Sequence, residues 1–334
     1  MGVPLFIISL DLSKKVITMI AIGVDIGGTS IKGALVNEKG QIIDRFSMKV
    51  SKSNSALEEI NKLCDIINDT IKRNKLDEPI SGIGIGIPGI LDMDQGIVIL
   101  SPNLPTWSNF NIKEAIEKRT GIEVIINNDA NVAALGEAKF GSGSNYSNSL
   151  MITLGTGVGG GIIIDGKLYD GNKHQGAELG HSLLVLNGRQ CGCGRKGCLE
   201  AYASATGLVR STKEAMEEHK ESLLWDVEKE HGGIDAQVAF IAANRGDLVA
   251  LTVVNQYVMY LSEGLIDYCN IFRPEVIILS GGVANEGENL FSRVRAYLKE
   301  HTYGMRGSPK VEVVPASLGY DSGKIGAACL VLFK

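Results

Sequence analysis

Ile22-Gly-Val-Asp-Ile-Gly-Gly-Thr29 and Thr153-Leu-Gly-Thr-Gly157 are two stretches of this 334-residue chain in which an apolar run ends in a glycine turn. A second apolar run follows each turn, which is typical of a β-hairpin. Because the hairpins open the two halves of the sequence, they form a weak internal repeat. The repeat predicts two related α/β domains with a cleft between them.

The predicted boundary between these domains is the Gly/Ser/Asn-rich stretch at residues 141–148, which has the composition of a linker. We therefore expect an N-terminal extension over residues 1–19, a first α/β domain over 20–145 and a second over 146–334. The apolar residues 3–10 of the extension are too few to cross a bilayer, which needs about 20 residues. They also lack the cleavage site of a secretory signal.

Hydrophobic periodicity predicts the remaining elements. Strands are expected at 20–37 on both sides of the first glycine turn, and at 41–50, 80–87, 124–126, 150–154, 161–165, 275–279 and 311–314. Helices are expected at 55–73, 112–119, 130–140, 204–218, 235–244, 247–271, 287–300 and from 322 to the end. The last helix is expected to pack back on the first domain.

Composition and charge exclude several classes of function. A net charge of −5 without a basic block argues against nucleic acid as a partner, because phosphate binding needs clustered Lys and Arg. No stretch has the length and hydropathy of a membrane span, so we expect no membrane partner. Six cysteines without a secretory signal indicate the reduced cytoplasm rather than a disulfide framework.

The glycine turns are candidate phosphate sites, because backbone N–H groups can converge on phosphate oxygens there. Asp25–Thr29 adds a hydroxyl and an acid that can hold Mg²⁺ through water. The second turn is the glycine run Gly157–Gly161, and Ser280-Gly-Gly282 is a third. Neither of the first two is a Walker A or dinucleotide motif. Plain hairpins are the alternative for either turn alone, and the third turn favours phosphate binding.

A cluster of metal-ligand residues follows the second turn. It consists of one imidazole and three thiols, contributed by His181, Cys191, Cys193 and Cys198. A Cys₃His set suits tetrahedral Zn²⁺ with no open position, hence a structural ion. Glycines at 192, 194 and 197 allow the chain to wrap closely round such an ion. The alternative is a free-thiol loop or a disulfide.

Asp129 is the candidate general base. It lies at the carboxyl end of a predicted strand, where ligand crevices form in α/β folds, and a carboxylate can accept the proton of a substrate hydroxyl. The alternative is that Asp129 only caps the following helix. Candidate groups for reading a polyol are Asn103, Asn128, Glu178, His181 and Glu200. A turn role for Asn103 and a helix-start role for Glu200 remain open.

Asp25–Thr29, Asn128-Asp-Ala-Asn131, Leu154–His181 and Leu279–Val283, together with the cysteine cluster, resemble the ROK family of repressors, uncharacterised reading frames and sugar kinases. The resemblance runs from about residue 20 to the C-terminus. It implies a two-domain α/β protein with the actin-like, hexokinase-like ATPase fold, which is ribonuclease H-like, and an active site in the interdomain cleft.

The resemblance also implies roles for individual residues. Asp129 would be the catalytic base, and the sugar would contact Gly89, Asn103, Asn128, Asp129, Glu178, His181 and Glu200. ATP and Mg²⁺ would contact Asp25, Gly27, Gly28, Thr29, Lys32, Thr156, Gly157, Gly281 and Gly282. The structural Zn²⁺ would be held by His181, Cys191, Cys193 and Cys198. One departure is Ala177, where many relatives have glycine.

These roles predict a cytoplasmic kinase that transfers phosphate from ATP to the 6-hydroxyl of a hexose, with glucose as the expected substrate. An N-acetylhexosamine kinase or a fructokinase is the alternative within the family, and a non-catalytic sugar-sensing regulator is the alternative from another class. Repressors of the family carry an N-terminal helix-turn-helix. Fewer than 20 residues precede the first predicted strand, so we expect a kinase. The family also implies a homodimer or a dimer of dimers.

Overall fold

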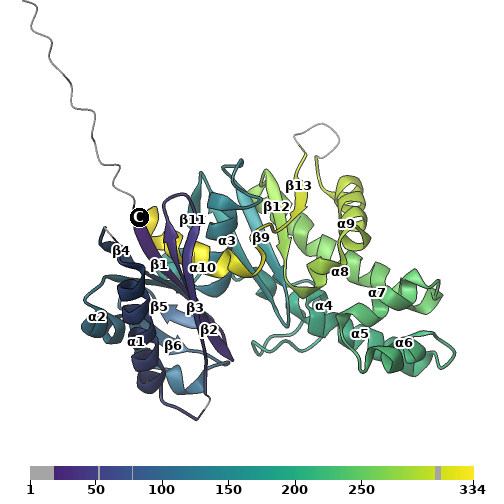
Figure 1. Ribbon diagram of the computed structural model, residues 1–334. Helices are drawn as coiled ribbons and strands as arrows, with labels where there is room; N and C mark the ends of the chain where they lie inside the picture. The colour runs from purple at the N-terminus through teal and green to yellow at the C-terminus, as the bar shows by residue number, and fades with distance from the viewer. Residues whose placement is uncertain (1–18, 52, 77, 305–309) are drawn as a thin grey trace, which may run out of the picture.

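The computed structural model describes residues 19–51, 53–76, 78–304 and 310–334 (Figure 1). All but Met19 of the expected N-terminal extension therefore lies outside the described residues. The described chain contains two five-stranded sheets. The first has the order β3-β2-β1-β4-β8, with β1 at Ile20–Ile26, β2 at Ser30–Asn37, β3 at Ile42–Lys49, β4 at Ile80–Ile87 and β8 at Val124–Asn128. The second has the order β11-β10-β9-β12-β13, with β9 at Ser149–Leu154, β10 at Val158–Ile164, β11 at Lys167–Tyr169, β12 at Val276–Ser280 and β13 at Glu312–Pro315.

The two sheets are built in the same way. Each begins with an antiparallel hairpin, β1–β2 or β9–β10. Each then extends by parallel strands on the other side of the first strand, β4 and β8 or β12 and β13. The internal repeat of the sequence is therefore a repeat of topology. Because these strands run parallel, their carboxyl ends meet at one edge of each sheet, which is where α/β folds bind ligands.

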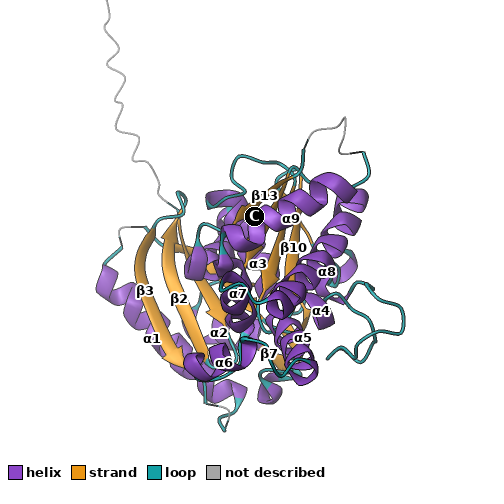
Figure 2. Cartoon of the chain, turned by 90° about the vertical axis from the view of Figure 1, so that its right-hand side faces the viewer, coloured by secondary structure: helices purple, strands orange, loops and turns teal. Residues whose placement is uncertain are grey.

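The helices form layers on both faces of the sheets. They are α1 (Ala56–Asn74), α2 (Ile112–Thr120), α3 (Asp129–Phe140), α4 (Glu200–Ala203), α5 (Ala205–Glu218), α6 (Leu224–His231), α7 (Ala236–Asn244), α8 (Leu248–Phe272), α9 (Glu288–His301) and α10 (Ser322–Leu332). α1 and α2 share one apolar core with the first sheet, whereas α8 and α9 share the largest core with the second. Figure 1 shows α3 and α10 between the sheets, and Figure 2 shows α3 there from the side. In the described part of the chain, no helix combines the length and hydropathy needed to cross a membrane.

The two central helices pack at backbone distance. A Cβ at Gly326 of α10 would lie 1.6 Å from the carbonyl oxygen of Val132 in α3. A Cβ at Gly23 of β1 would lie 1.8 Å from the carbonyl oxygen of Lys324 in α10. Only glycine permits both approaches. The C-terminal helix is therefore held against the first sheet and against α3.

Most predicted elements are present, and the structure differs from the expected elements in a few places. The structure adds α6, the edge strand β11, and a small sheet of β5 (Ile90–Asp92), β6 (Ile97–Leu100) and β7 (Phe110–Asn111). The expected glycine loop Gly157–Gly161 is wrong beyond Gly157, because Val158 already begins β10. The physical reason is α3: a Cβ at Gly161 would lie 2.4 Å from the Cβ of Ala134. Gly159 and Gly161 therefore make room for this helix.

Glu137 of α3 joins the two places where the chain passes between the sheets. Its fully buried carboxylate accepts backbone N–H groups from Ser142 (2.9 Å), just after α3, and from Ser317 (3.1 Å) and Leu318 (2.8 Å), just before α10. Gly141 leaves the space, since a Cβ there would lie 2.0 Å from Oε2. The segment after α3 and the segment before α10, which connect the two sheets, are thus both hydrogen-bonded to the Glu137 side chain.

Replacing Glu137 with alanine is expected to lower the free energy of unfolding by on the order of 3 kcal/mol or more, because three backbone N–H groups lose an acceptor that is fully buried. Urea denaturation measures the effect. Glu137→Gln keeps one carbonyl oxygen as acceptor and should cost clearly less. Equal stabilities for the alanine variant and the wild type would contradict this role.

Candidate active site

The candidate site begins at the edge of the first sheet where three parallel strands end. Asp25 lies near the end of β1, Gly89 follows β4, and Asp129 follows β8. The register pairs Asp25 with Gly86 and Ile87 with Asn128, so the three strands end side by side. Three of the predicted functional positions are therefore neighbours, although Gly89 follows Asp25 by 64 residues in the sequence and Asp129 follows Gly89 by 40.

Asp129 is the first residue of α3 but not its cap. The N-cap is Asn128, whose Oδ1 accepts the N–H groups of Ala130 (2.9 Å) and Asn131 (3.4 Å). The half-buried Asp129 carboxylate accepts the Ala130 N–H at 2.9 Å. Burial raises the pKa of Asp129 to about 6, and the negative charges of Asp25 and Glu178 add to this rise. Because Asn128 does the capping, the alternative interpretation of Asp129 loses its support.

The first glycine turn lies beside this carboxylate. Burial also raises the pKa of Asp25, against the opposing effect of the Lys324 and Lys32 ammonium groups. A Cβ at Gly28 would lie 3.2 Å from the Cβ of Asn103, so the turn contacts a predicted sugar-binding residue. Thr29 is exposed at the end of the turn. The structure thus brings the turn, Asp25 and Asn103 together.

Gly89 and Lys32 are two further predicted positions in the first half of the chain. Gly89 has a φ of 122°, and a Cβ there would lie 2.2 Å from the carbonyl oxygen of Leu100, close to Asn103 in the chain. Lys32 is exposed on β2, with its ammonium 5.7 Å from the centre of the Tyr320 ring. Lys32 therefore lies at the border of the site, and its charge acts on Asp25 from there.

The second and third glycine turns meet at the edge of the second sheet. The second is closed by the Gly155 N–H donating to the Gly157 carbonyl oxygen at 3.0 Å, with Thr156 exposed between them. Gly281 has a φ of 89°, and a Cβ there would lie 2.5 Å from the carbonyl oxygen of Leu154. Gly282 follows it, exposed. The two turns thus form one glycine-rich edge of the second sheet, at which Thr156 and Gly282 are exposed.

Glu200 connects the second turn to the cysteine cluster. Its Oε2 accepts the Val158 N–H at 3.0 Å, and a Cβ at Gly157 would lie 2.4 Å from the same oxygen. The Cys191 thiol lies 3.4 Å from Oε1 and donates to it. No spacing in the sequence indicates these contacts, because Glu200 and the turn are more than 40 residues apart.

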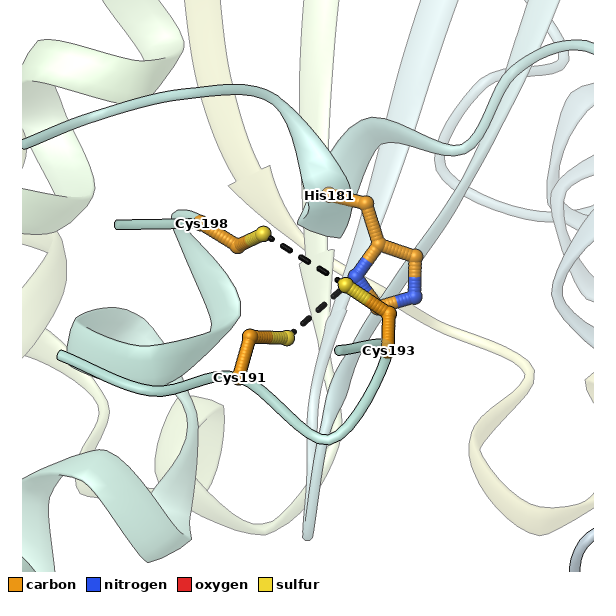
Figure 3. A group of neighbouring side chains, drawn as sticks. All are labelled: His181, Cys191, Cys193 and Cys198. Carbon is orange, nitrogen blue, oxygen red and sulfur yellow. Dashed lines mark hydrogen bonds between the residues drawn. The ribbon is translucent and has the colours of Figure 1, made fainter. Parts of the chain in front are cut away.

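The predicted metal ligands lie together in Figure 3. One ligand atom each from His181, Cys191, Cys193 and Cys198 lies within 4.8 Å of every other. The sulfurs of Cys193 and Cys198 are 3.7 Å apart, and the Cys191 sulfur is 3.6 Å from His181 Nδ1. Zinc bonds of ordinary length at tetrahedral angles would place such pairs about 3.8 and 3.6 Å apart. The four residues therefore fit tetrahedral zinc.

His181 belongs to this cluster and borders the glycine turn. It ends the short 3₁₀ helix Leu179–His181, which packs on β10 so closely that a Cβ at Gly180 would lie 1.9 Å from the Val158 carbonyl oxygen. Figure 3 shows Nδ1 turned toward the sulfurs and the second ring nitrogen turned away from them. One imidazole can thus hold an ion with one nitrogen and offer the other to a ligand.

Lys324 is a charged residue at this site that the sequence did not indicate. It lies in the first turn of α10 with its ammonium buried, 2.7 Å from an Asp321 carboxylate oxygen and 3.0 Å from the Tyr320 carbonyl oxygen. Its charge opposes the rise in the pKa of Asp25. The apolar residues around Lys324 predict a packed helix. They do not indicate that the lysine pairs with Asp321 or that its charge acts on Asp25.

The comparisons with known proteins point to one family. A family model described as the ROK family matches residues 21–334. A glucokinase of Halalkalibacterium halodurans is 37% identical over 313 residues, which cover 93% of this chain and 94% of that protein. The crystal structure of a ROK family glucokinase from Streptomyces griseus, in complex with glucose and AMPPNP, has a TM-score of 0.77 and 34% identity, over 94% of this chain and 100% of that one. A xylose repressor of Bacillus subtilis is 31% identical, over 93% of this chain and 77% of the repressor.

Two sheets of the same topology, two central helices and glycine turns at the strand ends define an actin-like, hexokinase-like ATPase fold. The chain belongs to the ROK family. The resemblance and the fold class predicted from the sequence are therefore confirmed.

Proposed function

We propose that this protein is an ATP-dependent hexose kinase that phosphorylates the 6-hydroxyl, with glucose as its preferred substrate. The observation that carries the proposal is the Asp129 carboxylate: it is half-buried, it does not belong to the N-cap residue of α3, and it lies where three strands end. The glucokinase relatives support the substrate. Because ATP is supplied inside the cell, we place the reaction in the cytoplasm.

In the proposed reaction, Asp129 accepts the proton of the 6-hydroxyl while the hydroxyl oxygen forms its bond to the γ-phosphorus. The bond between that phosphorus and the β,γ-bridging oxygen breaks, and ADP leaves. Little covalent chemistry falls to the protein, which acts by position and electrostatics. Asn128, Glu178, Glu200 and the second nitrogen of His181 orient the sugar. Gly89 and Asn103 border it on the side of the first sheet.

The glycine turns hold the nucleotide in this proposal. Backbone N–H groups around Gly27 to Thr29 and around Thr156 and Gly157 surround the phosphates, and Gly281 and Gly282 border the adenosine. The negative charges of Asp25 and Glu178 each repel that of Asp129, which fits a site that receives a divalent cation. Asp25 would hold Mg²⁺, and that ion would neutralise charge on the phosphates.

The rate should depend on pH through Asp129. A general base works only when it is unprotonated, so kcat/KM for the sugar should rise about tenfold per pH unit below a midpoint near 6 and level off above it. Glu178→Gln provides the control, because removing that negative charge lowers the pKa of Asp129 and moves the midpoint to lower pH. The ionisation of ATP contributes equally to the profiles of the wild type and of Glu178→Gln, so it cannot cause a difference between their midpoints. A flat profile, or identical midpoints, would contradict the assignment.

A coupled ADP assay with glucose, mannose, fructose and N-acetylhexosamines tests the substrate. We expect the highest kcat/KM for glucose. A preference for an N-acetylhexosamine or for fructose would replace glucose with the alternative of the same family. The likeness to a xylose repressor supports a sugar-sensing regulator as the alternative class. Tight sugar binding without turnover of any hexose would favour that regulator.

A further inference from the structure

The loop that carries Glu178 has a strained backbone. Between β11 and the 3₁₀ helix Leu179–His181, φ is positive at Gly171 (75°), Lys173 (50°), His174 (59°) and Ala177 (63°). Residues other than glycine adopt this region only at a cost, and they do so where surrounding contacts hold them. A loop of this kind needs anchors, and the position of Glu178 depends on them.

One carboxylate supplies anchors at the start of the loop. Asp170 Oδ2 accepts the Nδ1–H of His174 at 2.8 Å and an amide N–H of Asn127 at 3.3 Å. The Asp170 carbonyl oxygen also accepts the Gly176 N–H at 2.6 Å. Asp170 therefore holds two later residues of the loop, His174 and Gly176, and it also joins the loop to Asn127 near the end of β8 in the first sheet.

Asn127 forms hydrogen bonds with residues on both sides of the candidate base in the chain. It is buried, and its Oδ1 accepts the Asn128 N–H (2.7 Å) and a side-chain N–H of Asn131 (3.0 Å). Both partners flank Asp129 in the chain. The amide group of Asn127 is thus shared between the start of α3 and the Asp170 carboxylate.

A second contact crosses to the small sheet. His174 Nε2 lies 3.7 Å from a carboxylate oxygen of Asp94, in the turn between β5 and β6. The groups Asp94, His174, Asp170 and Asn127 therefore form one line of polar contacts. The line runs from the first half of the chain through the loop of the second half and back to the first.

We propose that Asp170 is a positioning residue for the sugar site, and that His174 assists it by fixing the orientation of the carboxylate. The Asp170–Asn127 hydrogen bond places the Glu178 loop relative to the residues that flank Asp129, and so sets the affinity for the sugar. This inference rests on the proposed hexose kinase function. Neither residue touches the reacting atoms.

Asp170→Ala tests the inference through hexose binding and steady-state kinetics. The dissociation constant for glucose, measured by calorimetry without ATP, is expected to rise about tenfold, the range for a lost charge-assisted hydrogen bond. KM for the sugar should rise similarly, whereas kcat should stay within about threefold because the base is intact. Asp170→Asn keeps an acceptor oxygen of the same size and should recover most of the affinity.

A matched pair of histidine variants completes the test. His174→Asn removes the imidazole at a half-buried position, and asparagine tolerates the positive φ there. His231 pairs with Asp235 at the same four-residue spacing and 2.9 Å, on α6 and its C-terminal side, so His231→Asn is the control. Should Asp170→Ala fail to fold, His174→Asn carries the test, with weaker sugar binding expected.

The outcomes separate this inference from the proposed function. Unchanged sugar affinity in both Asp170→Ala and His174→Asn would overturn the positioning role. An equal loss of affinity in His231→Asn would overturn it as well. A wild-type protein that binds no hexose would instead refute the kinase proposal on which the inference rests.

Discussion

Asp129→Asn is expected to reduce hexose turnover by at least about 10²-fold, with the dissociation constant for the sugar within about threefold of wild type. Asparagine keeps an oxygen that can accept the Ala130 N–H, as Asp129 Oδ1 does at 2.9 Å. It cannot accept the proton of the sugar hydroxyl. Coupled ADP release measures the turnover, and calorimetry measures the binding.

Thermal unfolding of Asp129→Asn tests whether the loss of turnover comes from damage to the fold. The pKa of Asp129 is about 6 in the folded protein, above its ordinary value of 3.8. Ionisation of this carboxyl therefore destabilises the fold fully above pH 6 and not at all below about pH 4. The variant should be at least as stable as wild type at pH 8, with the difference vanishing toward pH 4. Near-normal turnover would reject Asp129 as the base.

Loss of zinc is expected to weaken sugar binding by at least about tenfold, and ATP binding much less. The ion would hold His181, whose second nitrogen is proposed to contact the sugar, and Cys198, two residues before Glu200. Cys198→Ser, or chelation followed by dialysis, removes the ion. Calorimetry with glucose in the absence of ATP and Mg²⁺ then reports the sugar site alone.

Zinc added back to the chelated wild-type protein is the control, and it should restore both one bound ion per chain and the sugar affinity. The backbone pairs Leu183–Cys198 and Gln190–Lys196 give the loop some structure of its own. The expected result is therefore a local loosening rather than global unfolding. Normal sugar affinity in a protein proven free of zinc would refute the coupling between the ion and the sugar site.

Local patterns in the sequence were sufficient for most elements and for the outline of the site. The apolar runs of β1, β4 and β9 end in glycine turns, and Ser55 begins α1 with a capping box, so local chemistry and fold agree there. The cysteine spacing predicted a cluster that the structure brings together. These signals lie within a few residues of each other, where sequence patterns are informative.

Local patterns do not predict contacts between residues that are distant in the sequence. Gly159 and Gly160 were expected to continue a loop, but they lie in β10, where α3 packs on Gly159 and Gly161. The helix α6 has no side-chain cap at its start, so its first residue carries no signal. The hydrogen bond between Asn127 and Asp170 joins residues 43 positions apart, and no periodicity marks either one.

Glucose-dependent formation of ADP from ATP and Mg²⁺ by the purified protein tests the central claim most directly. We predict one ADP per glucose consumed, with phosphorus-31 and proton NMR showing the phosphate on the 6-oxygen of the product. Sugar binding without ADP formation from glucose or any other hexose would contradict the assignment of this site as that of a kinase.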